Sequence, residues 1–314
     1  MLPLMLAGAM AMGGSVGAKM DALGLWDALA PYNWAVKPAG TAFPYFCSIL
    51  KGDGKPVKVR FLMLEGWQTL HDYVRTRIDR NFGFVSAPIE LPHLELVVLT
   101  NGEMKLFRHD AGFVPVEAKE PQRALAARIL WEAYGVMLRV ESDRDLPMRF
   151  AGEKSIFCRL ETSPGKWTDG PLEIPDPRPQ VEKVSFLKAD LAKAKDLPVV
   201  TGDVLELDFR LLPNVMTKEP RPRCVYGLVA VDPATGERAV DCRVSIAADG
   251  GLRGLWESMP PQFLKELIRR GKVPGEIRLV SGRVFRLLRS LGMELPFKLS
   301  LHDRLPALEA AFRV

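Results

Sequence analysis

The order of apolar segments in the last third of the chain constrains the fold more than any other feature of the sequence. Strand-like runs are expected at residues 204–212, 223–232, 239–247, 276–280 and 296–302. Helix-like runs are expected at residues 260–271, 283–292 and 305–312. This βββαβαβα order predicts a mixed sheet with helices packed on it. The first three strands should be antiparallel, and residues 276–280 should run parallel to and beside the first, with right-handed β-α-β connections.

The same order resembles the ribonuclease-H-like fold of nucleases, integrases and transposases, over about residues 203–314. Asp208 lies midway along the first predicted strand. The segment GKVPGEIRLVSG, residues 271–282, resembles the approach of integrases to their fourth strand. For an enzyme of this kind, the resemblance implies several carboxylates that converge on two metal ions.

The candidate acid site is a remnant that comprises Asp208, Glu206 and Ser281. Asp208 supplies one acid, Glu206 shares its strand face, and Ser281 stands where the resemblance places a second essential aspartate. A hydroxyl cannot replace an anionic ligand of Mg²⁺. Asp303 and Glu309 are candidates for a late acid, but the set stays incomplete. We therefore predict no catalytic residue, and the alternative reading of Glu206 and Asp208 is a polar strand face on which charges pair.

Short segments spread over the whole chain are similar to those of an uncharacterised bacterial protein family. They are YFC (45–47), LEGW (64–67), ILWE (129–132) and PFKLSLH (296–302). The resemblance implies two domains of unknown function, one near the N-terminus and one at the C-terminus. Because that family has no assigned activity, the resemblance implies no substrate or partner.

Positive charge is concentrated near the C-terminus. Of the chain's 43 Lys and Arg and 38 Asp and Glu, residues 261–314 hold 11 and 5, a net of +6, so the remainder carries −1. A local basic excess can attract an anionic partner. The candidate anion-binding residues are Arg269, Arg270, Lys272, Arg278, Arg283, Arg286 and Arg289. The sequence leaves two interpretations open, a phosphate-binding surface or a solvated helix face opposite an apolar stripe.

The first half of the chain predicts a ββα unit made twice. The first unit is a hairpin at residues 43–64 around a Gly-Asp-Gly turn, followed by a helix at 65–83. The second is a hairpin around Asn101-Gly102, followed by a helix from about Pro121. The Pro-rich region that follows predicts strands SIFCRLE (155–161) and EKVSFLK (182–188), and a short helix, ADLAKAKD (189–196).

These patterns predict an α+β protein with three regions. They are a flexible leader at residues 1–20, an N-terminal α+β domain with its Pro-rich connection at 21–199, and a C-terminal mixed α/β domain at 200–314. The leader holds an apolar run and SVGA, which resembles a signal-peptide cleavage site, but no Lys or Arg precedes the run. We predict a cytoplasmic protein, with export by the leader as the alternative.

Residue types that carry metal or cofactor chemistry are sparse. The four cysteines form no CxxC pair and none lies near a histidine at zinc spacing, which fits a reducing compartment. Cys47 and Cys158 are expected to be small core residues. The four histidines are scattered, and Walker A, GxGxxG and HExxH patterns do not occur. We predict no metal site and no cofactor.

The function predicted from the sequence is that of a non-catalytic binding or interaction protein without a membrane partner. Its partner is left open between a protein and a nucleic acid, which the basic C-terminal domain would bind. A metal-dependent nuclease or transposase-like enzyme is the remaining alternative, and the incomplete acid set argues against it.

Overall fold

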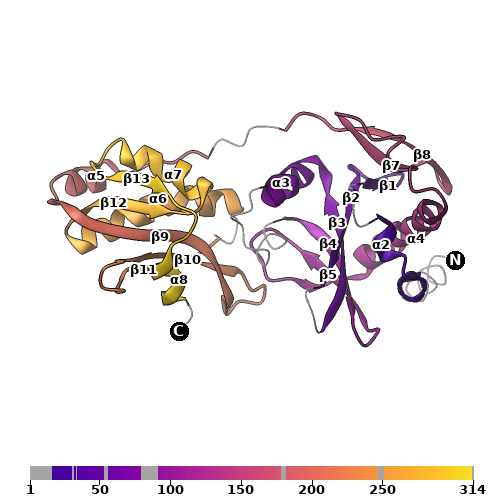
Figure 1. Ribbon diagram of the computed structural model, residues 1–314, viewed down its shortest axis with the longest axis horizontal. Helices are drawn as coiled ribbons and strands as arrows, with labels where there is room; N and C mark the ends of the chain where they lie inside the picture. Colours follow the sequence, from indigo (N-terminus) through magenta and orange to yellow (C-terminus); the bar gives the residue numbers. More distant parts are fainter. Residues whose placement is uncertain are drawn as a thin grey trace. The chain divides into compact units, whose positions relative to one another are not determined.

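The computed structural model describes residues 16–29, 32, 34–52, 56–78, 91–177, 182–246 and 251–312. The chain divides into two compact units (Figure 1). The N-terminal unit comprises Met1–Ile78, Ala87–Asp110 and Pro115–Arg178, and the C-terminal unit comprises Asp79–Ser86, Ala111–Val114 and Pro179–Val314. The predicted α+β class is confirmed, because each unit contains a mixed sheet with helices. The predicted domain boundary at residues 199 and 200 stays a prediction.

The N-terminal unit is built on one sheet with the strand order β6-β5-β4-β3-β2-β1-β7-β8. Its strands are β1 (Trp34–Lys37), β2 (Tyr45–Lys51), β3 (Val57–Glu65), β4 (His93–Leu99), β5 (Met104–His109), β6 (Val116–Glu117), β7 (Ser155–Ser163) and β8 (Lys166–Glu173). Neighbouring strands are antiparallel except β1 and β7, which are parallel.

Both predicted ββα units lie in this sheet. Strands β2 and β3 precede α3 (Gly66–Ile78), and β4 and β5 precede the short β6 and then α4 (Glu120–Ser142). The Asn101-Gly102 hairpin is confirmed: Gly102 has a φ of 83°, and the Leu99 N–H donates to the Glu103 carbonyl at 2.8 Å. The loop therefore spans residues 100–102. The predicted end of the first helix, at residues 79–83, and most of the predicted Gly-Asp-Gly turn of the first hairpin lie outside the described residues.

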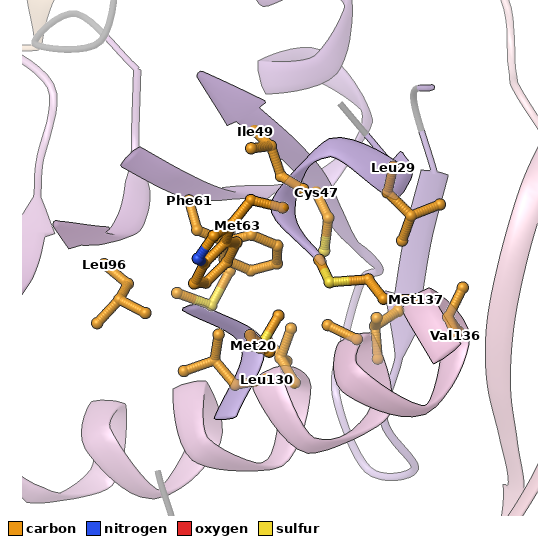
Figure 2. Packing of buried hydrophobic residues seen from close by; sticks show 14 of the residues in the cluster. Met20, Leu29, Cys47, Ile49, Phe61, Met63, Leu96, Leu130, Val136 and Met137 are labelled. Atoms are coloured by element: carbon orange, nitrogen blue, oxygen red, sulfur yellow. The ribbon is translucent and has the colours of Figure 1, made fainter. Parts of the chain in front are cut away.

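Helices cover both faces of the N-terminal sheet. On one face α4 and α2 (Trp26–Leu29) pack on the main core, to which Phe61 and Met63 of β3 belong. Figure 2 shows Cys47, Ile49, Phe61 and Met63 of the strands together with Leu130, Val136 and Met137 of α4 in this core. On the other face α3 contributes Leu70 and Tyr73 to a smaller cluster with Leu62 and Leu64 of β3. Alternate residues of β3 thus serve opposite faces, as the pleat requires.

Several local features differ from the sequence-based expectations. Residues 182–187 form no strand, so the prediction for EKVSFLK is wrong. Strand β8 was not predicted because its segment contains Gly170 and Pro171, which an edge strand tolerates. Residues 16–22 are helical, with Val16 and Met20 buried in the main core, although the predicted flexible leader extends to residue 20. Residues 1–15 lie outside the described part.

The C-terminal sheet has the strand order β11-β10-β9-β12-β13. Its strands are β9 (Val199–Met216), β10 (Cys224–Val231), β11 (Arg238–Ser245), β12 (Val273–Leu279) and β13 (Lys298–Leu301). Strand β10 is antiparallel to both β9 and β11, whereas β12 is parallel to both β9 and β13. The predicted βββαβαβα order and the pairing of the fourth strand beside the first are therefore confirmed.

The helices of the C-terminal unit are α5 (Lys188–Lys195), α6 (Leu252–Arg270), α7 (Gly282–Gly292) and α8 (Pro306–Ala311). Figure 1 shows α8 on one side of the sheet and α5, α6 and α7 on the other. Helix α6 begins eight residues before the predicted start and holds Pro260 and Pro261 in its interior. The burial of Leu255, Trp256 and Met259 in the first turns outweighs the helix-breaking tendency of the two prolines. Among the described residues, no helix combines the length and apolarity needed to cross a membrane.

Candidate functional site

The two acids of the remnant site lie on the face of β9 that α8 covers. Glu206 is buried and accepts a hydrogen bond from the Leu308 N–H at 2.9 Å. Leu308 is the third residue of α8, and N–H groups in the first turn have no partner within the helix. Glu206 therefore holds α8 on the sheet, which accounts for a buried carboxylate without any catalytic role.

Asp208 is engaged by its own neighbours. Its Oδ1 accepts the Phe209 N–H at 2.8 Å, and its Oδ2 lies 2.8 Å from the Arg210 guanidinium. Burial raises the pKa of Asp208 above its ordinary value, and the Arg210 charge opposes that rise. The predicted alternative, a strand face on which charges pair, describes this residue.

Ser281 is the N-cap of α7, and its Oγ accepts a hydrogen bond from the Val284 N–H at 3.3 Å. Serine is among the residues preferred at this position. Within the described residues no hydrogen bond or ion pair joins Ser281 to Glu206 or Asp208. Of the candidates for a late acid, Glu309 pairs with Arg304 at 2.6 Å. The structure thus gives each position of the predicted acid site a local structural use.

We expect the purified protein to leave DNA and RNA intact in the presence of Mg²⁺ or Mn²⁺. Two-metal phosphodiester chemistry needs several convergent carboxylates, and Glu206 and Asp208 are already engaged while Ser281 offers only a hydroxyl. The measurement is a cleavage assay on single- and double-stranded substrates. Metal-dependent cleavage that disappears in the Asp208→Asn variant would contradict this expectation.

Most of the candidate anion-binding residues are held by carboxylates. Arg269 pairs with Glu266, Arg278 with Glu276 and Arg283 with Glu182, while Arg270 and Lys272 share Asp203. The Arg283 guanidinium also lies 3.9 Å from the centre of the Trp256 ring. Arg286 and Arg289 are exposed on α7, and neither makes an ion pair within the described part of the chain. Five of the seven residues therefore lie in ion pairs, but of their four carboxylate partners only Glu182 and Asp203 lie outside residues 261–314, so they reduce the net charge of that region only from +6 to +4.

A different group of side chains comes together on β4 and β5 of the N-terminal unit. His93 and His109 are directly opposite one another, and their rings stack with centroids 4.0 Å apart and an interplanar angle of 18°. Glu95 follows His93 by two residues, so it shares the same face. Its Oε2 lies 2.7 Å from His109 Nε2, and its Oε1 is bound by Arg60 of β3. The exposed fractions of His93, Glu95 and His109 are 0%, 2% and 3%.

The protonation of this cluster follows from its contacts. His93 Nδ1 lies 2.7 Å from the Leu91 carbonyl oxygen, which can only accept, so Nδ1 carries the hydrogen. Burial, followed by the neighbouring His109, lowers the pKa of His93 to about 3. Burial by itself would raise the pKa of Glu95, but the close contacts with His109 and Arg60 lower it to about 2. At neutral pH the Glu95 carboxylate is therefore ionised and the His93 imidazole is neutral.

The four histidines are scattered along the sequence, and the prediction of no metal site did not anticipate this cluster. His93, Glu95 and His109 each offer one potential metal-ligand atom, and these atoms lie within 4.8 Å of one another. Among the described residues, they form the cluster of His, Cys, Asp or Glu side chains that could hold a metal ion. The Asn101-Gly102 hairpin signal placed the two histidines on neighbouring strands, but it did not give the register that pairs His93 with His109.

The exposed face of α4 is unusually apolar. Ala124, Ala127, Trp131, Gly135 and Leu138 recur at helical spacing, and we call this set the α4 stripe. Trp131 is 49% exposed and Leu138 is 40% exposed. A Cβ added at Gly135 would meet no atom within 4 Å, so the helix surface is open there.

Comparison with known proteins bears on the C-terminal unit alone. Residues 190–314 match the family model described as Domain of unknown function (DUF6930). The matched region contains most of α5, the helices α6, α7 and α8, and all five strands of the C-terminal sheet. No curated protein and no solved structure matches the chain. The prediction of a domain of unknown function in the C-terminal part is therefore confirmed.

Proposed function

We propose that this protein is a non-catalytic binding protein. The observation that carries the proposal is the structural use of the predicted acid positions. Glu206 binds the first turn of α8, Asp208 pairs with Arg210, and Ser281 caps α7. None of the three contributes an unengaged carboxylate to a shared point, which a two-metal hydrolase needs.

We also propose that residues 200–314 form a ribonuclease-H-like domain. The support is the strand order β11-β10-β9-β12-β13, with β12 and β13 parallel to β9 and a helix after the last strand. The second domain of unknown function, at residues 21–199, and the cytoplasmic location are proposed from the sequence alone.

We place the binding surface on the α4 stripe. The charged residues that flank it are turned toward β7 and β8, where Arg128 pairs with Glu161, Glu132 with Arg159, and Arg139 with Asp169. The stripe runs over about 21 Å of helix, from Ala124 to Leu138. It is bordered by Arg128 and Arg139, whose paired side chains stay 41% and 42% exposed. Exposed tryptophan in such a setting is typical of protein interfaces rather than of nucleic-acid surfaces.

The occupant that suits this surface is the same stripe of a second copy. In an antiparallel helix pair, Trp131 of one copy would lie over the open surface at Gly135 of the other, and the two-fold axis would repeat the contact. Because one helix face is smaller than a standard interface, the expected dissociation constant is about 1–100 μM.

Sedimentation velocity between about 1 and 200 μM protein, a range that brackets this dissociation constant, tests the proposal. We expect the dimer fraction to rise with concentration for the wild type and to disappear for Trp131→Glu, because a buried unpaired charge opposes association. The matched control is Met293→Glu, which places the same charge at an exposed apolar residue outside the stripe. A wild type that stays monomeric, or a Trp131→Glu variant that dimerises normally, would refute self-association.

Nucleic-acid binding is the weaker candidate. Five of the seven basic residues predicted for it lie in ion pairs, and only Arg286 and Arg289 remain exposed without such a pair in the described residues. Two arginines are far fewer than the six to ten phosphate contacts of a typical strongly salt-dependent binder. We therefore do not propose this function.

A further inference from the structure

We propose that His93, Glu95 and His109 form a binding site for a divalent transition-metal ion of the zinc class. The inference is independent of the binding role of α4, because it rests on β4, β5 and their immediate contacts. Two imidazoles and one carboxylate are the ligands of many zinc, nickel and iron sites, whereas Mg²⁺ and Ca²⁺ prefer oxygen. The site offers three protein ligands and leaves a fourth position for water.

The first line of support is the unpartnered lone pair of His93. Its Nδ1–H donates to the Leu91 carbonyl at 2.7 Å, which fixes the tautomer and leaves Nε2 as an acceptor. His93 Nε2 is buried and has no hydrogen-bond partner. A buried acceptor without a donor is unfavourable, because its lost interaction with water is not replaced. A ligating histidine usually has this arrangement, in which the nitrogen that does not bind the metal donates to a carbonyl or carboxylate.

The second line of support is the relation between Glu95 and His109. The carboxylate Oε2 and the ring Nε2 are 2.7 Å apart, yet the ring is not aligned for a hydrogen bond, and His109 Nδ1 also lacks a partner. Arg60 occupies the other carboxylate oxygen of Glu95. The contact with Arg60 orients the carboxylate, as hydrogen bonds from residues around a metal site orient its ligands. The positive charge of Arg60 also limits the affinity of the site for a cation.

The third line of support is the rigidity of the frame. His93 and His109 are cross-strand partners, so their Cβ atoms are held about 4.5–5.5 Å apart by the ladder. The ligand atoms of all three residues lie within 4.8 Å of one another. An ion can therefore be bound through small side-chain rotations. Because the three side chains are almost fully buried, we assign the ion a structural role in joining β4 to β5.

The test uses the full chain after removal of metal with a chelator. Zn²⁺ is titrated by calorimetry and Co²⁺ by visible absorption, whose intensity reports the coordination geometry of the bound ion. We expect one equivalent of either ion to bind to the wild type. His93→Gln and His109→Gln should each weaken binding by about 100-fold or more, since even the loss of an outer partner costs about 10–100-fold. The matched control, His302→Gln, removes an exposed histidine elsewhere and should bind as the wild type does.

A further variant keeps the proposal falsifiable if the glutamine variants fail to fold. His109→Cys retains a ligand, and its Co²⁺ complex should show an intense near-ultraviolet thiolate band that the wild type lacks. The proposal is overturned if the folded wild type binds neither ion at one equivalent. It is also overturned if the folded glutamine variants bind as tightly as the wild type, or if the Co²⁺-loaded cysteine variant shows no thiolate band.

Discussion

Trp256→Ala is expected to destabilise the C-terminal unit by about 3–5 kcal/mol, the usual cost of truncating a buried tryptophan. Trp256 is buried on α6, where its ring meets Phe209 at 5.0 Å in an edge-on arrangement and Tyr226 at 6.1 Å between centroids. The guanidinium of Arg283 covers another part of the ring at 3.9 Å. Alanine would therefore leave a cavity beside two aromatic rings and release Arg283 from its stacking position.

Urea denaturation followed by circular dichroism measures this loss. Trp256→Phe, which keeps a ring, should lose less than half as much stability as the alanine variant. Met293→Ala serves as the control in the same unit, because Met293 is 76% exposed and its truncation should change stability by no more than about 0.5 kcal/mol. If Trp256→Ala and Met293→Ala behave alike, the assignment of Trp256 to the core is wrong.

Asp203→Ala should cost about 3 kcal/mol, because it leaves a nearly buried arginine without its counter-charge. Arg270 donates to both carboxylate oxygens of Asp203, at 2.7 and 2.9 Å, and Lys272 lies 3.4 Å away. The contrasting variant is Glu266→Ala, which removes the partner of the neighbouring, exposed Arg269 and should change stability by at most about 0.5 kcal/mol. Similar losses in the two variants would contradict the different burial of these arginines.

The ion pair between Asp203 and Arg270 should stabilise the fold in a way that depends on pH. Burial raises the pKa of Asp203, but Arg270 and Lys272 outweigh that effect and hold the pKa below its ordinary value. A carboxyl whose pKa is lower in the folded state stabilises the fold fully above its unfolded value of about 4 and progressively less as the pH falls below it. Stability measured from pH 7 to pH 2 should therefore fall less steeply for Asp203→Asn than for the wild type.

The C-terminal sheet was predictable because its signals are local. Each strand and helix from residue 204 onward has its own period, and the crossover rule leaves few ways to arrange them. The same reasoning could not reveal the use of the acids in that sheet. Glu206 is occupied by a backbone group 102 residues away, and Arg283 by a carboxylate 101 residues away. These long-range contacts form only when the segments pack together in the folded unit, so the residue pattern along a strand does not predict them.

The histidine cluster illustrates a finer limit. A two-residue turn at Asn101-Gly102 would pair His93 with Asp110, whereas the three-residue loop of the structure pairs it with His109. A shift of one residue moves every side chain of a strand to the other face. The identity of the hairpin was readable from the sequence, but the register that brings the two imidazoles together was not.

The sequence by itself determined the α+β class, the strand and helix order of the C-terminal sheet, both N-terminal hairpins and the burial of Cys47 and Cys158. Each depends on periodicity or turn chemistry within a short window. Only the tertiary structure decided that five of seven basic residues are neutralised, that the α4 stripe is exposed, and that His93, Glu95 and His109 converge. Burial and charge pairing depend on groups brought together from distant parts of the chain, and a linear pattern does not contain their distances.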